Sequence, residues 1–85
     1  MNIKVNDIVK FDNYSYQVLD IITFENNYYA YLINNDEFIN DTSIVRLEKV
    51  GKMIDFRHID NDIEFKYVLY KIYLNHKRDI LSFFD

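Results

Sequence analysis

The first fifty residues alternate between apolar and polar side chains in short runs, which is the spacing typical of β-strands. Residues 8–11 form an apolar run that ends at a turn-forming Asp-Asn pair, and residues 14–18 alternate large apolar with small polar side chains. Asn and Asp favour tight turns because they tolerate a left-handed backbone conformation. The pattern therefore predicts a β-hairpin over residues 8–18.

The alternation changes phase after Val18, since Leu19 and Ile21 fall on the face that Ser15 and Gln17 occupied. Such a change predicts a β-bulge, or a strand that crosses between two packed faces. A strongly bent sheet would contain either feature.

A second turn is predicted at residues 25–27, which read Glu-Asn-Asn. Residues 28–33 are aromatic and β-branched and too few to favour a helix, so we expect them to form a central strand. Residues 34–42 are rich in Asn and Asp. They predict an exposed loop anchored by Phe38 and Ile39.

The strand pattern resumes at residues 43–48, before the only glycine of the chain, Gly51. We interpret Gly51 as the joint between sheet and helix, because glycine adopts the left-handed conformation that redirects a chain. Residues 53–59 alternate as in an edge strand, although no strong breaker excludes an early helix. We expect a strand or an extended segment there.

A helix is predicted from residues 61–64, which read Asn-Asp-Ile-Glu and combine a capping side chain with an acid three residues later. Oxygen-bearing residues also alternate at 60–64 as in a calcium loop, but that loop needs a glycine that is missing here. Apolar residues then recur at the helical period, which predicts a buried stripe formed by Phe65, Val68, Leu69 and Ile72.

The same helix carries a second apolar surface made of Tyr67, Tyr70, Tyr73 and Leu74. A clearly polar arc is left only for Glu64, Lys71, Asn75 and Arg78. Such a helix is either wrapped by its own sheet on more than one side, or it presents a tyrosine-rich stripe to another molecule. Of these alternatives we favour burial within the chain.

These elements predict an α+β fold in one domain, residues 1–85, with residues 1–59 mainly β and residues 60–85 helical. The sheet is expected to be small, antiparallel and strongly bent, or a partial SH3-like barrel, closed by the C-terminal α-helix. Eight tyrosines and seven phenylalanines can fill a core in so short a chain. A chain of this length has no room for a separate catalytic domain.

Composition narrows the setting of the protein. The chain has no cysteine, so it forms neither a disulfide framework nor a thiolate metal site. Polar residues interrupt the apolar ones over residues 1–7, unlike a signal peptide or a membrane span. We therefore predict a cytoplasmic location, the host cytoplasm if a phage encodes the chain, and no contact with a membrane.

The sequence shows no catalytic motif. His58 and His76 lie eighteen positions apart without cysteine, so no metal site is predicted, and one glycine cannot build a phosphate-binding loop. The three serines lack the glycine-flanked setting of a hydrolase nucleophile. We expect a protein that is not an enzyme and that uses no cofactor.

The order of apolar patterns resembles the YrzB-like family of small Firmicutes proteins, which has no assigned function. The resemblance rests on residues 16–20 (YQVLD), 25–27 (ENN), 28–32 (YYAYL), 43–47 (SIVRL) and 63–68 (IEFKYV). The chain departs from that family's acidic character through eight bases in its second half. Residues 5–11 (VNDIVKF) also resemble the first strand of SH3-like small barrels. Both resemblances imply a compact β-module and neither implies catalysis.

Charge is divided unevenly along the chain. Residues 1–42 hold seven acids against two lysines, and residues 43–85 hold seven acids against eight bases, which gives a net charge of −4. We predict a protein-binding module, for example a phage or mobile-element accessory protein that inhibits a host protein such as a defence nuclease. The candidate binding residues are Tyr28, Tyr29, Tyr31, Tyr67, Tyr70 and Tyr73 together with the acids Asp36, Glu37 and Asp41.

Two alternatives remain open. The first is a nucleic-acid-binding protein, although its net negative charge makes this partner unfavourable. It would use the bases Arg46, Lys49, Lys52, Arg57, Lys66, Lys71, Lys77 and Arg78. The second alternative is a structural homodimer joined along Tyr67, Tyr70 and Leu74.

Overall fold

The computed structural model describes residues 3–34 and 41–82, with the side chains described as far as His76. Within these residues the chain forms five strands and one helix. They are β1 (Ile8–Phe11), β2 (Tyr14–Phe24), β3 (Asn27–Asn34), β4 (Thr42–Val50), β5 (Met53–His58) and α1 (Asp62–Ser82).

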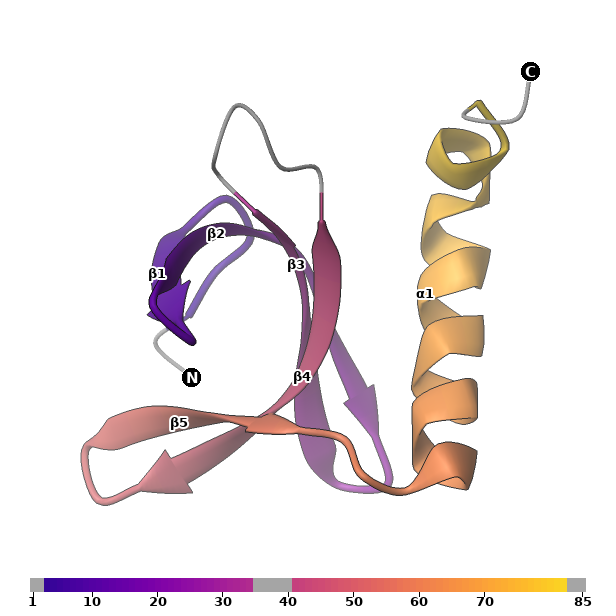
Figure 1. Cartoon of the computed structure of the whole chain (residues 1–85). Helices are drawn as coiled ribbons and strands as arrows, with labels where there is room; N and C mark the ends of the chain where they lie inside the picture. Colours follow the sequence, from indigo (N-terminus) through magenta and orange to yellow (C-terminus); the bar gives the residue numbers. More distant parts are fainter. Residues whose placement is uncertain (1–2, 35–40, 83–85) are drawn as a thin grey trace.

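The strands form one antiparallel sheet in which each strand pairs with the next, in the order β1-β2-β3-β4-β5. The sheet bends until its two edges approach each other (Figure 1). The ring centroids of Phe11 in β1 and Phe56 in β5 are 6.0 Å apart, and His58 Nε2 lies 3.0 Å from Asp12 Oδ2. The predicted bent sheet is confirmed as a nearly closed, barrel-like sheet, consistent with a small SH3-like fold.

Two hairpin turns owe their shape to Asn, Asp and Glu residues with a left-handed backbone. Asp12 and Asn13 have φ angles of 50° and 69°, and Glu25 and Asn26 have φ angles of 49° and 66°. Two successive positive φ angles match the right-handed twist of a hairpin. Both turns lie where the sequence predicted them.

The predicted change of phase in β2 is a β-bulge. Val18 pairs with Leu32 and Asp20 pairs with Tyr31, so Leu19 is an extra residue in the ladder. A bulge bends its strand and increases the local twist. In this sheet the bulge bends the long strand β2, which pairs with β1 at its start and with β3 along the rest of its length.

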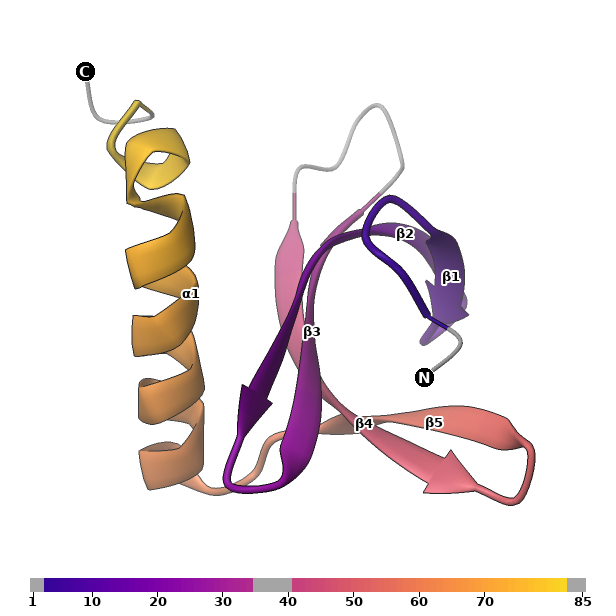
Figure 2. The same ribbon diagram turned by 180° about the vertical axis from the view of Figure 1, so that it is seen from behind.

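The sheet has a buried layer on each face. The inner layer contains Tyr16, Val18, Ala30, Leu32, Val45 and Leu47. The outer layer is covered by α1, and joins Ile22 and Tyr29 of the sheet to Val68 and Ile72 of the helix. Figure 2 shows that α1 stands on the side of the sheet away from β1. The helix therefore covers the outside of the sheet, and the expectation that it closes the barrel holds only in this looser sense.

The three predictions about the connections between elements have different outcomes in the structure. Gly51 has a φ of 62° and lies in the turn between β4 and β5, so its interpretation as the joint to the helix is wrong. The expected strand at residues 53–59 is confirmed as β5. Of the predicted loop, Asn34 and Thr42 belong to strands, and residues 35–40, with Phe38 and Ile39, lie outside the described residues.

Candidate protein-binding surface

The first turn of α1 is fixed by a cap that the sequence predicted. The side-chain oxygen of Asn61 accepts a hydrogen bond from the Glu64 N–H at 3.0 Å, and its carbonyl accepts one from the Phe65 N–H at 2.9 Å. Asp62 and Glu64 place acids in the first turn, where they suit the helix dipole. The cap fixes where the helix begins and helps to set which side of α1 meets the sheet.

The buried stripe of α1 is narrower than the sequence predicted. Val68 and Ile72 are fully buried against Ile22 and Tyr29. Phe65 and Leu69 were expected in the same stripe but are 38% and 44% exposed. The inward face of the helix therefore offers two large apolar side chains, one turn apart.

Polar side chains beside this apolar pair connect the helix to the sheet by hydrogen bonds. Lys71 Nζ donates a hydrogen bond to the Thr23 carbonyl at 2.9 Å. Asn75 Nδ2 lies 3.2 Å from Asp20 Oδ2, and His76 Nε2 lies 2.9 Å from the same oxygen. Lys71 and Asn75 of the predicted polar arc thus turn toward the sheet, because hydrogen-bonding partners are available there.

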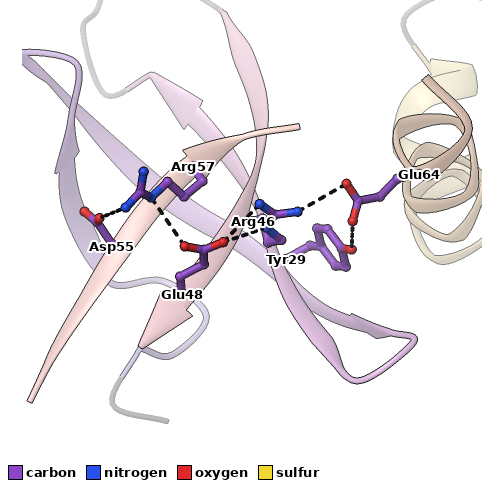
Figure 3. Close-up of polar contacts among 6 residues, drawn as sticks. All are labelled: Tyr29, Arg46, Glu48, Asp55, Arg57 and Glu64. Carbon is purple, nitrogen blue, oxygen red and sulfur yellow. Dashed lines mark hydrogen bonds and ion pairs between the residues drawn. The ribbon is translucent and has the colours of Figure 1, made fainter. Parts of the chain in front are cut away.

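A chain of ion pairs connects the sheet to the start of α1 (Figure 3). Arg57 contacts Asp55 at 3.0 Å and Glu48 at 3.4 Å, and Arg46 contacts Glu48 at 3.0 Å and Glu64 at 3.5 Å. Alternating charges compensate one another along such a chain. Arg46 and Arg57 are therefore occupied by acids of their own molecule.

Tyr29 ends this chain and is fully buried. Its hydroxyl donates a hydrogen bond to Glu64 Oε2 at 2.6 Å. Burial, with the hydrogen bond and the negative charge of Glu64, raises the pKa of Tyr29 to about 12. Tyr29 joins helix to sheet and offers no surface to a partner, so its place among the candidate binding residues is wrong.

The outward face of α1 is apolar, contrary to the expected burial of this helix on several sides. Ile63, Tyr67, Tyr70, Tyr73 and Leu74 are 40% to 68% exposed. At about 100° per residue, four of them, all but Tyr73, lie within about 60° of one another, opposite Val68 and Ile72. We call these five residues the outward face.

A hollow of about 330 Å³ lies on the outward face, lined by Ile63, Lys66, Tyr67 and Tyr70. These residues are separated by three, one and three positions, so they form a diamond on the helix surface. One wall is held in place, because the Tyr67 ring stacks on Phe24 with centroids 5.4 Å apart.

The other candidate tyrosines do not share one surface. Tyr31 is half-buried in the outer layer, where its ring lies 5.6 Å from that of His76. Tyr28 is 44% exposed, but it belongs to the inner face of the sheet. Of the six tyrosines predicted to bind a partner, only the three of the helix therefore lie on the outward face.

Tyr28 lines a shallow groove of about 590 Å³ between the β2–β3 turn and the β4–β5 hairpin. Lys49 and Lys52 stand at this groove, and neither makes an ion pair with a described residue. Its apolar floor is limited to Leu47 and Ile54, beside Tyr28.

The predicted charged residues do not gather on one described surface. Asp36 and Glu37 lie outside the described residues, as do the side chains of Lys77 and Arg78, and Asp41 is exposed. Of the described bases, Lys49 and Lys52 lie on a hairpin and Lys66 on the outward side of α1. Lys71 binds Thr23, and the two arginines are paired with acids.

Residues 3–34 and 41–76 contain no cluster of three His, Asp or Glu side chains that could hold a metal ion. His58 is exposed beside Asp12, and His76 is half-buried beside Asp20.

Sequence reasoning missed Ile63 as a surface residue, because it was assigned to the helix cap. The signal that could have identified it is a spacing of four, three and four positions between Ile63, Tyr67, Tyr70 and Leu74. This spacing places the four side chains in one line along the helix.

No protein-family model matches this chain, and the searches of curated proteins and of solved structures found no match either. The resemblance to the YrzB-like family stays a prediction. Within the described residues, no helix combines the length and the apolar character needed to cross a membrane.

Proposed function

We propose that this chain is a non-enzymatic protein-binding module that docks through the outward face of α1. The observation that carries the proposal is the exposure of five large apolar side chains on one side of a helix whose other side is anchored to the sheet. Contiguous exposed apolar surface costs free energy in water, and it marks interaction sites in folded proteins.

Residue type supports the same function. Three of the five residues are tyrosines, which offer a large contact area, few rotatable bonds and a polar tip. The part of the helix before His76, where the backbone leaves the helical conformation with φ −123° and ψ 19°, is held in place because Glu64, Lys71 and Asn75 tie it to the sheet. A preorganised surface loses little conformational entropy when it binds.

The chemistry of the described residues supports a non-enzymatic role. Tyr29, whose pKa is raised to about 12, is fully buried and bonded to Glu64. The ion-pair chain from Asp55 to Glu64 is used to join elements of the fold. These groups join elements of the fold and so stabilise the molecule.

The test is an affinity capture from a bacterial lysate with the tagged chain and two variants, after nuclease treatment. Tyr70→Glu places a charge at the centre of the outward face, where Tyr70 is 60% exposed. Tyr28→Glu is the matched control, since Tyr28 is also an exposed tyrosine but lies on the other face of the sheet. We expect the wild type and the control to retain the same partner, and Tyr70→Glu to lose at least about nine tenths of it.

Circular dichroism of each variant checks that the fold is kept. Equal capture by all three proteins would remove the outward face from consideration. Equal loss in both glutamate variants would indicate a general effect of added negative charge. A partner that disappears with nuclease would favour nucleic acid as the ligand.

A further inference from the structure

The hollow on α1 has the geometry of a helix-pairing site. Its four lining residues, Ile63, Lys66, Tyr67 and Tyr70, stand in the i, i+3, i+4, i+7 relation. In paired helices a side chain of one helix inserts as a knob into a hole of this kind on the other. The four-three-four spacing of the outward face is likewise the spacing of a two-helix seam.

From this geometry we infer that the occupant of the outward face is the same face of a second copy of the chain, packed antiparallel about a twofold axis. The inference rests on the proposed docking face and names its partner. In this arrangement Ile63 lies opposite Leu74 of the second copy, and Tyr67 lies opposite Tyr70. Tyr70 of each copy enters the hollow of the other.

Charge favours the antiparallel orientation. In the antiparallel pair Lys66 flanks Tyr73 of the second copy, and a lysine over an aromatic ring is attracted to it.

Area supports a modest but specific dimer. Each side chain of the outward face leaves on the order of 100 Å² exposed. Two copies would therefore bury about 1,000 Å² of side chain, which is near the lower limit for a specific interface. An interface of this size is typical of weak, transient association rather than of a permanent dimer.

Sedimentation equilibrium over a concentration series tests the association. We expect the wild type to shift from the monomer mass of 10.4 kDa toward twice that mass as concentration rises. Tyr70→Glu should weaken association by more than about tenfold, and Tyr28→Glu should behave as the wild type. Association that is unchanged in Tyr70→Glu would overturn the inference.

Cysteine cross-linking tests the orientation, since the natural chain contains no cysteine. Ile63→Cys and Leu74→Cys are each exposed single-cysteine variants. A mixture of the two should form the mixed disulfide-linked dimer on mild oxidation, while either variant alone should form little. Linking of each variant to itself would indicate a parallel pair and overturn the antiparallel arrangement.

The two proposals can fail separately. A chain that stays monomeric at every concentration, while Tyr70→Glu still loses its lysate partner, overturns the second copy as occupant and leaves the outward face to a different protein. A monomeric chain whose captured proteins are unaffected by Tyr70→Glu overturns both.

Discussion

The hydroxyl of Tyr29 is a buried polar group whose hydrogen bond compensates for the loss of water. Glu64 Oε2 accepts this bond at 2.6 Å, and Arg46 lies 3.5 Å from the other carboxylate oxygen. A hydrogen bond to a charged acceptor contributes about 1.5 to 3 kcal/mol. At the scale of one residue, this contact connects the central strand to the first turn of α1.

Tyr29→Phe should lower the free energy of unfolding by about 2 kcal/mol at pH 7, measured by urea denaturation, because it removes the bond and leaves Glu64 less well paired. Tyr28→Phe is the control, since Tyr28 is 44% exposed and its substitution should change stability by less than about 0.5 kcal/mol. Equal effects of the two variants would contradict this role for Tyr29.

The raised pKa of Tyr29 also predicts that the protein loses stability in alkali. The pKa of this tyrosine is raised from 10.0 to about 12 in the folded state, so the unfolded state releases the proton first. The associated stability is therefore fully present below pH 10 and is lost as pH rises to about 12. Between these values the wild type should lose about 2 to 3 kcal/mol more than Tyr29→Phe. Parallel pH profiles for the two proteins would contradict the expectation.

At the scale of elements, α1 owes its position to its cap and to its contacts with the sheet. Asn61 supplies the acceptor for the Glu64 N–H, which otherwise has no partner in the first turn. Val68 and Ile72 then fall on the outer layer of the sheet. A helix with so few buried apolar residues depends strongly on such local contacts.

Asn61→Ala should therefore destabilise the protein by about 1 kcal/mol, while Asn61→Ser should stay close to the wild type because serine keeps an acceptor oxygen. Thermal unfolding followed by circular dichroism at 222 nm measures both. An alanine variant as stable as the serine variant would show that the cap does not support α1.

The sequence predicted those elements whose local chemistry leaves one choice. Asp12-Asn13 identifies a hairpin without knowledge of distant residues, and the phase change at Val18 left two alternatives, a bulge or a crossing strand, of which the structure has the bulge. Gly51 was misplaced because a positive φ suits a strand turn as well as a helix joint. The faces of α1 were misjudged because both carry apolar residues, and the partners of its polar residues, such as Asp20, lie far away in sequence.

At the scale of the whole molecule, the sheet is buried on both faces and the helix is exposed on its apolar side. The strands that line the inside of the barrel are also the strands that contact the helix on their other face. Little sheet therefore remains to cover the rest of α1. A chain of 85 residues that leaves five large apolar side chains exposed on the outward face of its helix gains stability if a second molecule covers them.

Charge at this scale opposes the nucleic-acid alternative. The net charge is −4, and Arg46 and Arg57 are paired with acids of the same molecule. Binding to a polyanion gains free energy by releasing counterions, which requires several unpaired bases together. The groove beside Tyr28 brings together two bases that are unpaired among the described residues, Lys49 and Lys52.

We therefore expect no saturable binding of single-stranded or double-stranded DNA or RNA in fluorescence polarisation at low salt, because a groove with two described lysines on a molecule of net charge −4 releases too few counterions. The double variant Lys49→Gln/Lys52→Gln, which makes the net charge more negative, should give the same trace as the wild type. Binding by the wild type that weakens with salt and is absent from the double variant would make the groove beside Tyr28 the functional surface. In that case a nucleic-acid strand would replace a protein as the ligand of this chain.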